Sequence, residues 1–358
     1  MNKDNPLSRR EFLKLTGIGV GALATRPWEN LLYQADFPQA ERLGRVTEGA
    51  INIRLRPDIN SPEVGKLYQD QVVPWLREVV GNMPLRHNQR WVETPDGYIW
   101  CPLLQPVRNF PQVPVDSLPQ TSLGDGMWVE VTVPYVDLHL INTEPIAPSV
   151  KNAIENGLKY RLYYGQIIWV DQIKVDGNGQ HWYQVNERYS YGDYFWAQAE
   201  AFRMLTNEDM APISPDVEDK RVDVNISRQT VSCFEGDTEV FFARASTGQV
   251  GEDTETSLSN WHRIWRKMVS SHMTGGTTGG GWDLAGIGWT TLFIGSGIAF
   301  HSTFWHNNFG ERMSRGCVNL TPDDARFIFH WTNPVVAYDP GDETVTGEQG
   351  TLIRVLEE

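Results

Sequence analysis

Alternating hydrophobic and polar positions predict β-strands along most of this chain. Ile51, Ile53 and Leu55 alternate with polar residues, and a Pro-Asp turn follows them at positions 57–58. The segment Asp96-Gly97-Tyr98-Ile99-Trp100 again joins a turn dipeptide to a strand-like run. Side chains of a strand alternate between its two faces, and Pro-Asp and Asp-Gly pairs favour tight turns. We therefore expect a first β domain over residues 41–112.

A second β-rich domain is expected over residues 126–210, after a Pro/Ser/Gly-rich linker at 111–125. Two alternating runs flank Asp176-Gly177-Asn178-Gly179, which is a strong hairpin signal. Its aromatic residues either form the core and edge of a barrel, the interpretation that we favour, or form a sugar-stacking face. These aromatics are Trp169, Trp182, Tyr183, Tyr194 and Trp196.

A third domain is expected over residues 217–356. It opens with a strand, a turn at Gly236-Asp237 and a second strand that ends at Ser246-Thr247-Gly248, and it closes with a strand in "GTLIRVLEE". Between them, nine of the twenty-three residues from Gly275 to Gly297 are glycine. Backbone freedom of this kind is costly to fix, so we expect either a mobile loop over a site or a plain irregular connection. The predicted fold class is mainly β.

Composition and charge narrow the function classes. A chain of 358 residues with 40% hydrophobic residues is long enough for two or three domains with real cores. The formal net charge of −14 argues against nucleic-acid binding, which needs a basic surface. It also argues weakly against adhesion to anionic lipid.

The N-terminal segment is typical of an export signal. Ser8-Arg9-Arg10-Glu11-Phe12-Leu13-Lys14 resembles the twin-arginine motif, and a short apolar run and an Ala22-Leu23-Ala24 site follow it. The run is too short for a bilayer span, which takes about 20 residues. We therefore predict a twin-arginine signal over residues 1–24 and a mature protein without a stable membrane span. The expected location is the periplasm, cell wall or extracellular space.

The chain has three cysteines, and the position of one of them, Cys317, indicates more than a structural role. An odd count in an exported protein leaves at least one cysteine unpaired. Cys101 and Cys233 lie in strand-like segments and are predicted to be buried apolar residues. Cys317 lies instead in a short Arg-Gly-Cys turn, sixteen residues after His301.

Cys317 and His301 are candidates for nucleophilic catalysis. Thiolate is the attacking species, so a catalytic cysteine needs a base or a positive field, and amides directed at the developing oxyanion. His301 can supply the base, Arg315 the positive charge, and Gly316 a tight turn that aims the amides of 316 and 317. A buried cysteine beside an unrelated histidine is the alternative for these two residues alone.

The whole string "IAFHSTFWHNNFGERMSRGCVNLTPDDARFIF" resembles the L,D-transpeptidase catalytic domain. That family has a histidine, about fifteen residues, then Ser/Thr-His-Gly-Cys-apolar-Asn/Arg. His301, Ser314, Gly316, Cys317 and Asn319 occupy matching positions. The resemblance implies a β-sandwich-like catalytic domain with a short helix after the cysteine motif. The first domain resembles a bacterial SH3-like barrel, and the second is a weaker match to the same type.

Two residues depart from the family pattern. Arg315 replaces the usual histidine before Gly-Cys, and Ser302 replaces the glycine after the first histidine. Arginine stays protonated and cannot act as a base. We therefore expect His301 to be the base and Arg315 to hold the thiolate electrostatically. Ser302, His306, Ser314 and Asn319 are expected to bind substrate or to orient these groups.

The resemblance implies a cysteine acyltransferase that acts on peptidoglycan stem peptides. A tetrapeptide donor would acylate Cys317 and a diamino-acid acceptor would take the acyl group, giving a 3→3 cross-link, with L,D-carboxypeptidase activity when water is the acceptor. Carbapenems are expected inhibitors, and no metal or cofactor is expected. The alternatives are a catalytically weak or inactive relative that binds cell wall, and a cysteine peptidase of another fold.

Overall fold

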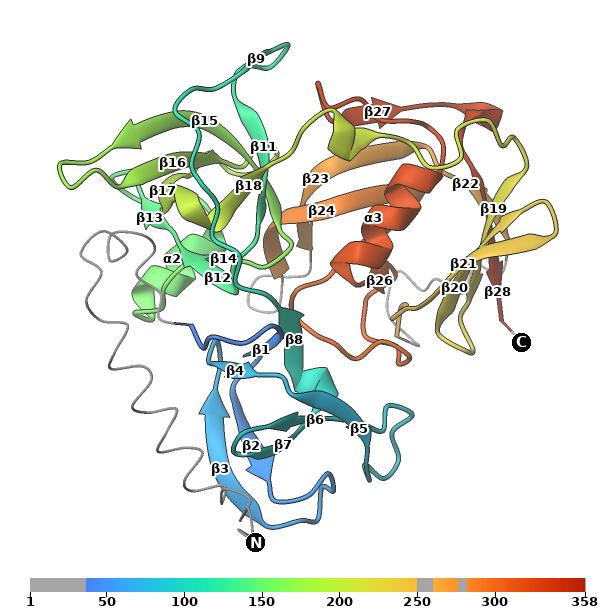
Figure 1. Cartoon of the computed structure of the whole chain (residues 1–358). Coiled ribbons are helices and arrows are strands. Elements are labelled where there is room, and N and C mark those ends of the chain that lie inside the picture. Colours follow the sequence, from blue (N-terminus) through green and yellow to red (C-terminus); the bar gives the residue numbers. More distant parts are fainter. Residues whose placement is uncertain (1–36, 250–259, 276–281, 358) are drawn as a thin grey trace, which may run out of the picture. The chain divides into compact units, whose positions relative to one another are not determined.

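The computed structural model describes residues 37–249, 260–275 and 282–357 (Figure 1). All of these described residues belong to one compact unit. The predicted twin-arginine segment lies outside the described residues. Because the three expected domains fall within one compact unit, their boundaries stay predictions. In the described part of the chain, no helix has the length and apolarity needed to cross a membrane.

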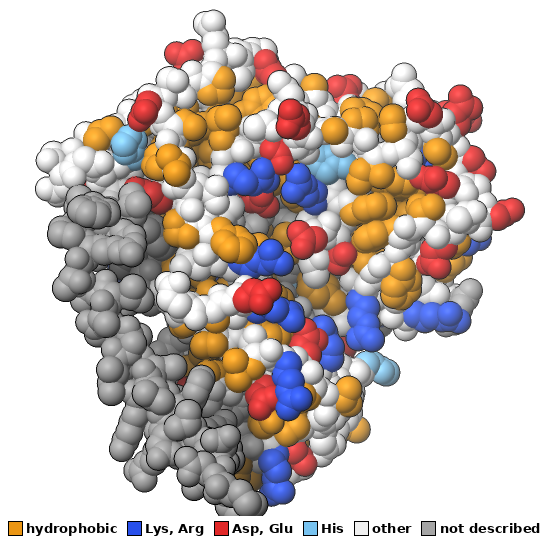
Figure 2. Space-filling view, viewed as in Figure 1, with side chains coloured by type: hydrophobic (Ala, Val, Ile, Leu, Met, Phe, Trp, Pro, Cys, Tyr) orange, Lys and Arg blue, Asp and Glu red, His pale blue; other side chains and the backbone are white. Residues whose placement is uncertain are grey.

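The surface carries charges of both signs. On the face shown in Figure 2, Lys and Arg side chains are interspersed with Asp and Glu side chains over its central part. Mixed charges of this kind form many surface ion pairs, such as Arg77 with Glu93 and Arg90 with Glu78. Such exposed pairs contribute little to stability.

The predicted mainly β fold class is confirmed. In the first β segment (residues 43–107), antiparallel strands form two sheets, with strand orders β4-β1-β8 and β3-β2-β7-β6-β5. Cys101 is buried in the core of this segment, as predicted. The elements are β1 (Leu43–Val46), β2 (Ala50–Arg54), β3 (Glu63–Tyr68), β4 (Val72–Pro74), β5 (Arg77–Val80), β6 (Arg90–Thr94), β7 (Gly97–Trp100), η1 (Cys101–Leu103) and β8 (Leu104–Val107).

In the second β segment (residues 127–204), a six-stranded sheet has the order β13-β17-β16-β15-β11-β18, and β12 pairs with β14. The predicted hairpin is confirmed, since Val175 pairs with His181. The elements are β11 (Met127–Val131), β12 (Tyr135–Asp137), β13 (His139–Leu140), α2 (Pro148–Glu155), β14 (Arg161–Tyr163), β15 (Ile167–Val175), β16 (His181–Asn186), β17 (Tyr194–Gln198), η2 (Ala199–Ala201) and β18 (Phe202–Met204). A small hairpin of β9 (Gln120–Thr121) and β10 (Gly124–Asp125) precedes it, and η3 (Glu208–Met210) follows.

The aromatic residues of this second segment divide between core and surface. Trp169 and Tyr183 are buried, which agrees with the favoured barrel-core interpretation. Trp182 and Trp196 are partly exposed and Tyr194 is exposed. The Lys174 ammonium lies 3.9 Å from the ring centre of Trp196, so that ring is already in contact with a cation.

The third β segment (residues 220–356) contains two five-stranded sheets, β21-β20-β19-β28-β22 and β26-β25-β24-β23-β27. The predicted closing strand is confirmed as β28, which runs parallel to β19. The opening differs from the expectation of one strand before the turn at Gly236-Asp237. Two strands, β19 and β20, precede that turn, because the chain also turns between Asn225 and Thr230. The elements are β19 (Lys220–Asn225), β20 (Thr230–Glu235), β21 (Thr238–Arg244), β22 (Trp261–Arg263), β23 (Arg266–Gly275), β24 (Trp282–Ile294), β25 (Ile298–Ser302), β26 (Val318–Leu320), α3 (Pro322–Trp331), β27 (Asp342–Thr344), η4 (Gly347–Gln349) and β28 (Leu352–Leu356).

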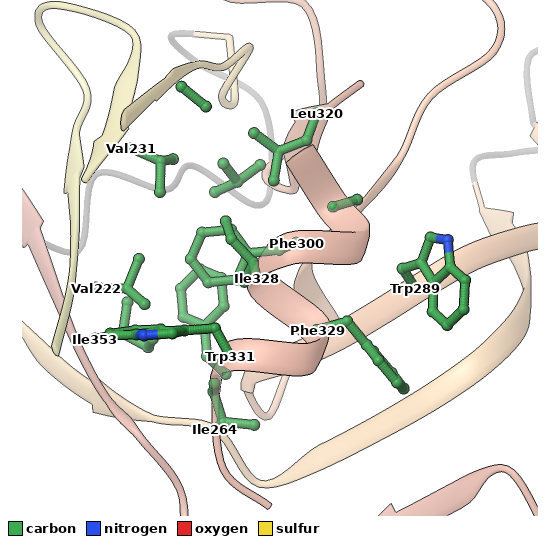
Figure 3. Packing of buried hydrophobic residues seen from close by; sticks show 14 of the residues in the cluster. Val222, Val231, Ile264, Trp289, Phe300, Leu320, Ile328, Phe329, Trp331 and Ile353 are labelled. Atoms are coloured by element: carbon green, nitrogen blue, oxygen red, sulfur yellow. The ribbon is translucent and has the colours of Figure 1, made fainter. Parts of the chain in front are cut away.

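Helix α3 joins these two sheets through an apolar core. Figure 3 shows Ile328 and Trp331 of the helix near Val222 and Ile353, which come from one sheet, and Phe300 of the other sheet in the same cluster. All are buried. Burial of large apolar side chains contributes roughly 1.5–3 kcal/mol each, so this core is a major source of stability for the segment.

Both ends of α3 are capped, which fixes the chain directly after the cysteine motif. At the N-terminus, the Thr321 side chain accepts a hydrogen bond from the Asp324 amide. At the C-terminus, the fully buried Lys267 of β23 donates to the carbonyls of Phe329, Thr332 and Pro334. A cation beside the last helical carbonyls is favourable. The predicted helix after the motif is therefore present, anchored to a strand of the sheet that carries His301.

The glycine-rich region is mostly regular strand, which corrects the expectation of a loop or an irregular connection. Of its described residues, Gly275 ends β23, residues 282–294 form β24, and residues 295–297 form the turn before β25; β23 and β24 pair antiparallel. Positions 276–281 lie outside the described residues. A Cβ atom at Gly288 would come within 2.9 Å of Ile167 in the second β segment. Glycine therefore allows close packing at this position.

Candidate active site

One cleft brings the two predicted catalytic side chains together. His301 of β25 pairs with Asn319 of the parallel strand β26, and Cys317 directly precedes that strand. His301, Cys317 and Asn319 line one cleft of about 860 Å³, together with Ser314 and Arg315. The predicted residues Ser302, His306 and Gly316 are not among those that line it.

His301 is held as a neutral base. Its side chain is buried, and its Nδ1 lies 2.9 Å from the carbonyl oxygen of Ser302. A carbonyl only accepts hydrogen bonds, so Nδ1 carries the proton and Nε2 keeps its lone pair. Burial lowers the pKa of His301 to about 4, partly offset by this backbone bond. The imidazole is therefore uncharged near neutral pH, and Ser302 orients it through its main chain.

Cys317 rests as a thiol. Its Sγ donates a weak hydrogen bond to the carbonyl oxygen of Gly297 at 3.7 Å. Burial raises the pKa of the Cys317 thiol to about 11, although the amide of Ala299 partly offsets the effect. With a neutral imidazole and a neutral thiol, proton transfer has to accompany attack on a substrate. The thiolate stabilisation expected from Arg315 stays a prediction.

The pH dependence of thiol alkylation tests this resting state. Because thiolate is the reactive form, a pKa near 11 places most of the rise in rate well above neutral pH. We expect the rate of iodoacetamide addition at Cys317, followed by peptide mass spectrometry, to increase steadily up to about pH 10. A rate that levels off below pH 8 would show a preformed thiolate and contradict the neutral pair. Free N-acetylcysteine, measured in parallel, provides the reference rate.

The turn before Cys317 is built by Ser314 and Gly316. Ser314 Oγ accepts from the Gly316 amide at 3.0 Å and donates to the Cys317 carbonyl at 2.5 Å. Gly316 has a φ of 146°, in the region that favours glycine, so its predicted role in turning the chain agrees with the geometry. The Gly316 amide, however, donates to Ser314 Oγ and is therefore not directed at a substrate oxygen. The predicted oxyanion role for Gly316 is therefore not supported, and the Cys317 amide remains as the main-chain candidate.

Residues 219–354 match the family model described as YkuD, the L,D-transpeptidase catalytic domain. We call residues 219–354 the YkuD domain, after the family model that they match. It includes helix α3, nearly all of both sheets of the third β segment, and both His301 and Cys317. A search of curated proteins finds no match.

Solved structures of L,D-transpeptidases are similar at low identity. A mutant of the Enterococcus faecium L,D-transpeptidase is 17% identical, with 40% of this chain and 51% of that chain covered and a TM-score of 0.30. The Mycobacterium smegmatis L,D-transpeptidase is 15% identical, with 68% and 95% covered and a TM-score of 0.31. L,D-transpeptidase 3 from Mycobacterium tuberculosis, in complex with a faropenem-derived adduct, is 16% identical, with 69% and 98% covered and a TM-score of 0.31. The chain thus spans about half of the Enterococcus faecium protein.

Arg315 lies over an aromatic ring at the cleft of the YkuD domain. Its guanidinium is 4.7 Å from the ring centre of Trp282, which is the first residue of β24. Both side chains line the cleft. This cation–π contact directs the Arg315 side chain toward β24. The sequence did not indicate Trp282 as a site residue, because pairing of β24 within its sheet is what brings it to the cleft.

His306 supports Asn319 from beneath the cleft. The Asn308 amide donates to His306 Nδ1 at 3.2 Å, and the Asn319 side-chain amide group lies 2.9 Å from His306 Nε2. Since Nδ1 accepts, Nε2 carries the proton and needs an acceptor, which is the Asn319 oxygen after an amide flip. Burial, with His301 nearby, lowers the pKa of His306 to about 3. Both ring nitrogens are engaged, so the geometry supports the predicted orienting role.

The second β segment also contributes to the cleft of the YkuD domain. Tyr189 lines it, and its hydroxyl donates to Asp342 at 2.9 Å. His272 of β23 also lines it and lies between two carboxylates, 2.5 Å from Glu187 and 2.7 Å from Asp283. These carboxylates outweigh burial and raise the pKa of His272 to about 9, so it is a cation at neutral pH. Sequence analysis missed both residues, because only the packing of the two segments shows them.

Proposed function

We propose that this protein is a peptidoglycan L,D-transpeptidase that forms 3→3 cross-links through an acyl-enzyme at Cys317. The observation that carries the proposal is a neutral imidazole with a free Nε2 lone pair and a thiol in one cleft of the YkuD domain. That pair is suited to acyl transfer without a cofactor. We also propose export by the twin-arginine route, supported by the residue pattern at positions 8–24.

The first half-reaction is acylation of Cys317. His301 Nε2 takes the thiol proton as Sγ attacks the carbonyl between the third, L-centred residue of the stem and its terminal D-alanine. A C–S bond forms, and the Cys317 amide is the proposed donor to the oxyanion. The imidazolium then returns the proton to the departing amine. The C–N bond breaks, D-alanine leaves and a thioester remains.

The second half-reaction transfers the acyl group. The side-chain amine of a neighbouring diamino-acid residue attacks the thioester carbonyl, the C–S bond breaks, and His301 relays the amine proton to the departing sulfur. The products are an amide cross-link and the resting thiol. Water in place of the amine gives the L,D-carboxypeptidase product. Carbapenems are proposed to acylate the same sulfur by opening of their lactam ring.

Product analysis with a defined substrate tests the proposal. Purified protein incubated with a disaccharide-tetrapeptide is expected to release D-alanine and to form a 3→3 cross-linked dimer, both detected by mass spectrometry. Incubation with a carbapenem is expected to add one covalent adduct at Cys317. Absence of product and of adduct would indicate a relative that binds cell wall without catalysis, and cleavage of ordinary L,L-peptides would indicate a cysteine peptidase.

A separate prediction concerns Arg315, which stands where the family pattern has a histidine. We expect Arg315→His to change the rate of D-alanine release by less than about tenfold, because His301 already provides a base with a fixed tautomer. The measurement is kcat with the disaccharide-tetrapeptide, with Arg315→Lys as the variant that keeps the charge. A gain of about a hundredfold in Arg315→His alone would show that a histidine at 315 shares proton transfer, and the assignment of His301 as sole base would be wrong.

A further inference from the structure

The segment between His301 and Cys317 is held by the first β segment. The Asn307 amide donates to the Pro102 carbonyl at 3.2 Å. The Glu311 carboxylate accepts from the His87 amide at 2.9 Å. Residues 303–312, the first part of the connection between β25 and β26, therefore have anchors outside the YkuD domain. The geometry around His301 depends on contacts from more than 190 positions away in the sequence.

Arg45 of β1 makes the most buried of these contacts. The residue is 1% exposed, and its guanidinium donates to Gln105 at 2.9 Å, to Asp70 at 2.7 Å and to the Phe304 carbonyl at 2.7 Å. The guanidinium also lies 4.0 Å from the ring centre of Tyr163. Burial of a charge is costly unless it is paired and fully hydrogen-bonded. The Arg45 guanidinium therefore contacts all three β segments, including Tyr163 of the second and Phe304 of the third. Its hydrogen bonds fix its position.

A short series of ring contacts connects Arg45 with His301. Phe304, whose carbonyl accepts from Arg45, stacks on Tyr163 with ring centres 5.1 Å apart. Its neighbour Trp305 contacts Phe304 edge to face at 5.1 Å and lies over His301 at 5.7 Å, with an angle of 32° between the rings. Trp305 and His301 both line the cleft. A displacement of the Phe304 backbone thus moves the ring that packs on the imidazole.

We propose that Arg45 is a positioning residue for acyl transfer: it holds the Phe304 carbonyl so that Trp305 keeps the His301 imidazole in its reactive orientation. The inference rests on the proposed function of the cleft. Under this proposal the first β segment takes part in the reaction, because Arg45 of β1, outside the YkuD domain, helps to orient the base His301. A misplacement of about 1 Å at a reacting group can cost about a hundredfold in rate.

Arg161 provides a matched control. It lies at the same junction, less buried than Arg45, and like Arg45 it pairs with Asp70, at 2.6 Å. Its other ion pair is with Asp137, within the second β segment. Arg161→Met and Arg45→Met therefore each remove one cation from the same carboxylate, but only Arg45→Met removes the bond to Phe304.

The kinetic test compares these two variants in the full chain. We expect Arg45→Met to lower kcat for D-alanine release by about tenfold to a hundredfold, with KM within about threefold of the wild-type value. Arg161→Met is expected to lower Tm while kcat stays within about twofold. Arg45→Lys keeps a charge for Asp70 but replaces the planar guanidinium and its several donors with one ammonium. We expect it to lower kcat by an intermediate factor, and it replaces Arg45→Met in the test if that variant does not fold. Equal loss of kcat in Arg45→Met and Arg161→Met, or none in Arg45→Met, would overturn the proposal.

A spectroscopic readout separates this inference from the proposed function. In protein with 13C-labelled histidine, the ring resonance of His301 is identified by its loss in His301→Gln. We expect it to shift in Arg45→Met, because the Trp305 ring current changes, and to stay unchanged in Arg161→Met. A wild-type protein without transpeptidase activity would reject the proposed function alone. An unshifted His301 resonance in Arg45→Met would reject the positioning role, whatever the activity.

Discussion

Replacing Cys317 with alanine is expected to abolish D-alanine release and carbapenem addition. Without the sulfur no thioester can form, and the rest of the cleft offers no equivalent nucleophile among its described lining residues. Loss of a covalent nucleophile of this kind typically costs more than about 10³-fold in kcat. The measurements are D-alanine release from the disaccharide-tetrapeptide and intact mass after carbapenem incubation.

Cys233→Ala is the matched control for this prediction. Cys233 is a buried free thiol in the same YkuD domain, and burial raises its pKa, so we expect it not to react at neutral pH. The Cys233→Ala protein should still release D-alanine and take up one carbapenem. Retention of either reaction in Cys317→Ala would reject the assignment of the nucleophile.

Replacing His301 with glutamine is expected to lower kcat by about 10²–10⁴-fold, the usual contribution of a general base. Glutamine has a similar volume but no lone pair able to take the thiol proton. In the wild-type protein the base works in its neutral form, so kcat should rise with pH through about 4, the pKa of His301, and stay level above it. A pH profile of wild type and His301→Gln on the same substrate measures both effects.

His330→Gln separates loss of a base from loss of a buried imidazole. His330 lies on α3 outside the residues that line the cleft, and burial lowers its pKa to about 4, as for His301. Its replacement should lower Tm and leave kcat close to the wild-type value. A kinetic pKa near 6.5 would show that burial does not lower the pKa of His301 in the working enzyme. Full activity in His301→Gln would show that another group is the base.

These predictions rest on two different kinds of information. The candidates Cys317 and His301 follow from the sequence, because a histidine and a Ser-Arg-Gly-Cys turn at this spacing form a local signature. Strand periodicity likewise predicted the hairpin at 176–179 and the closing strand of the chain. Local patterns carry this information because turns and alternation depend on neighbouring residues.

The glycine-rich region shows where local patterns mislead. Glycine commonly marks loops, yet here Gly286 and Gly288 lie within the long strand β24, close to Ile167 of the second β segment. The amide of Gly316 gives a second example. The sequence predicted that this amide donates to an oxyanion, but in the folded turn it donates to Ser314 Oγ.

The sequence by itself determined the chemistry of this protein: which thiol and which imidazole are available, the mainly β pattern, and the helix that follows the motif. Only the tertiary structure decided the charge states, the tautomer of His301, and the contacts that Arg45, Tyr189 and His272 make from strands and segments far along the chain. The physical reason is that desolvation and long-range hydrogen bonds depend on which distant segments exclude water from a group. No local pattern of residues specifies that arrangement.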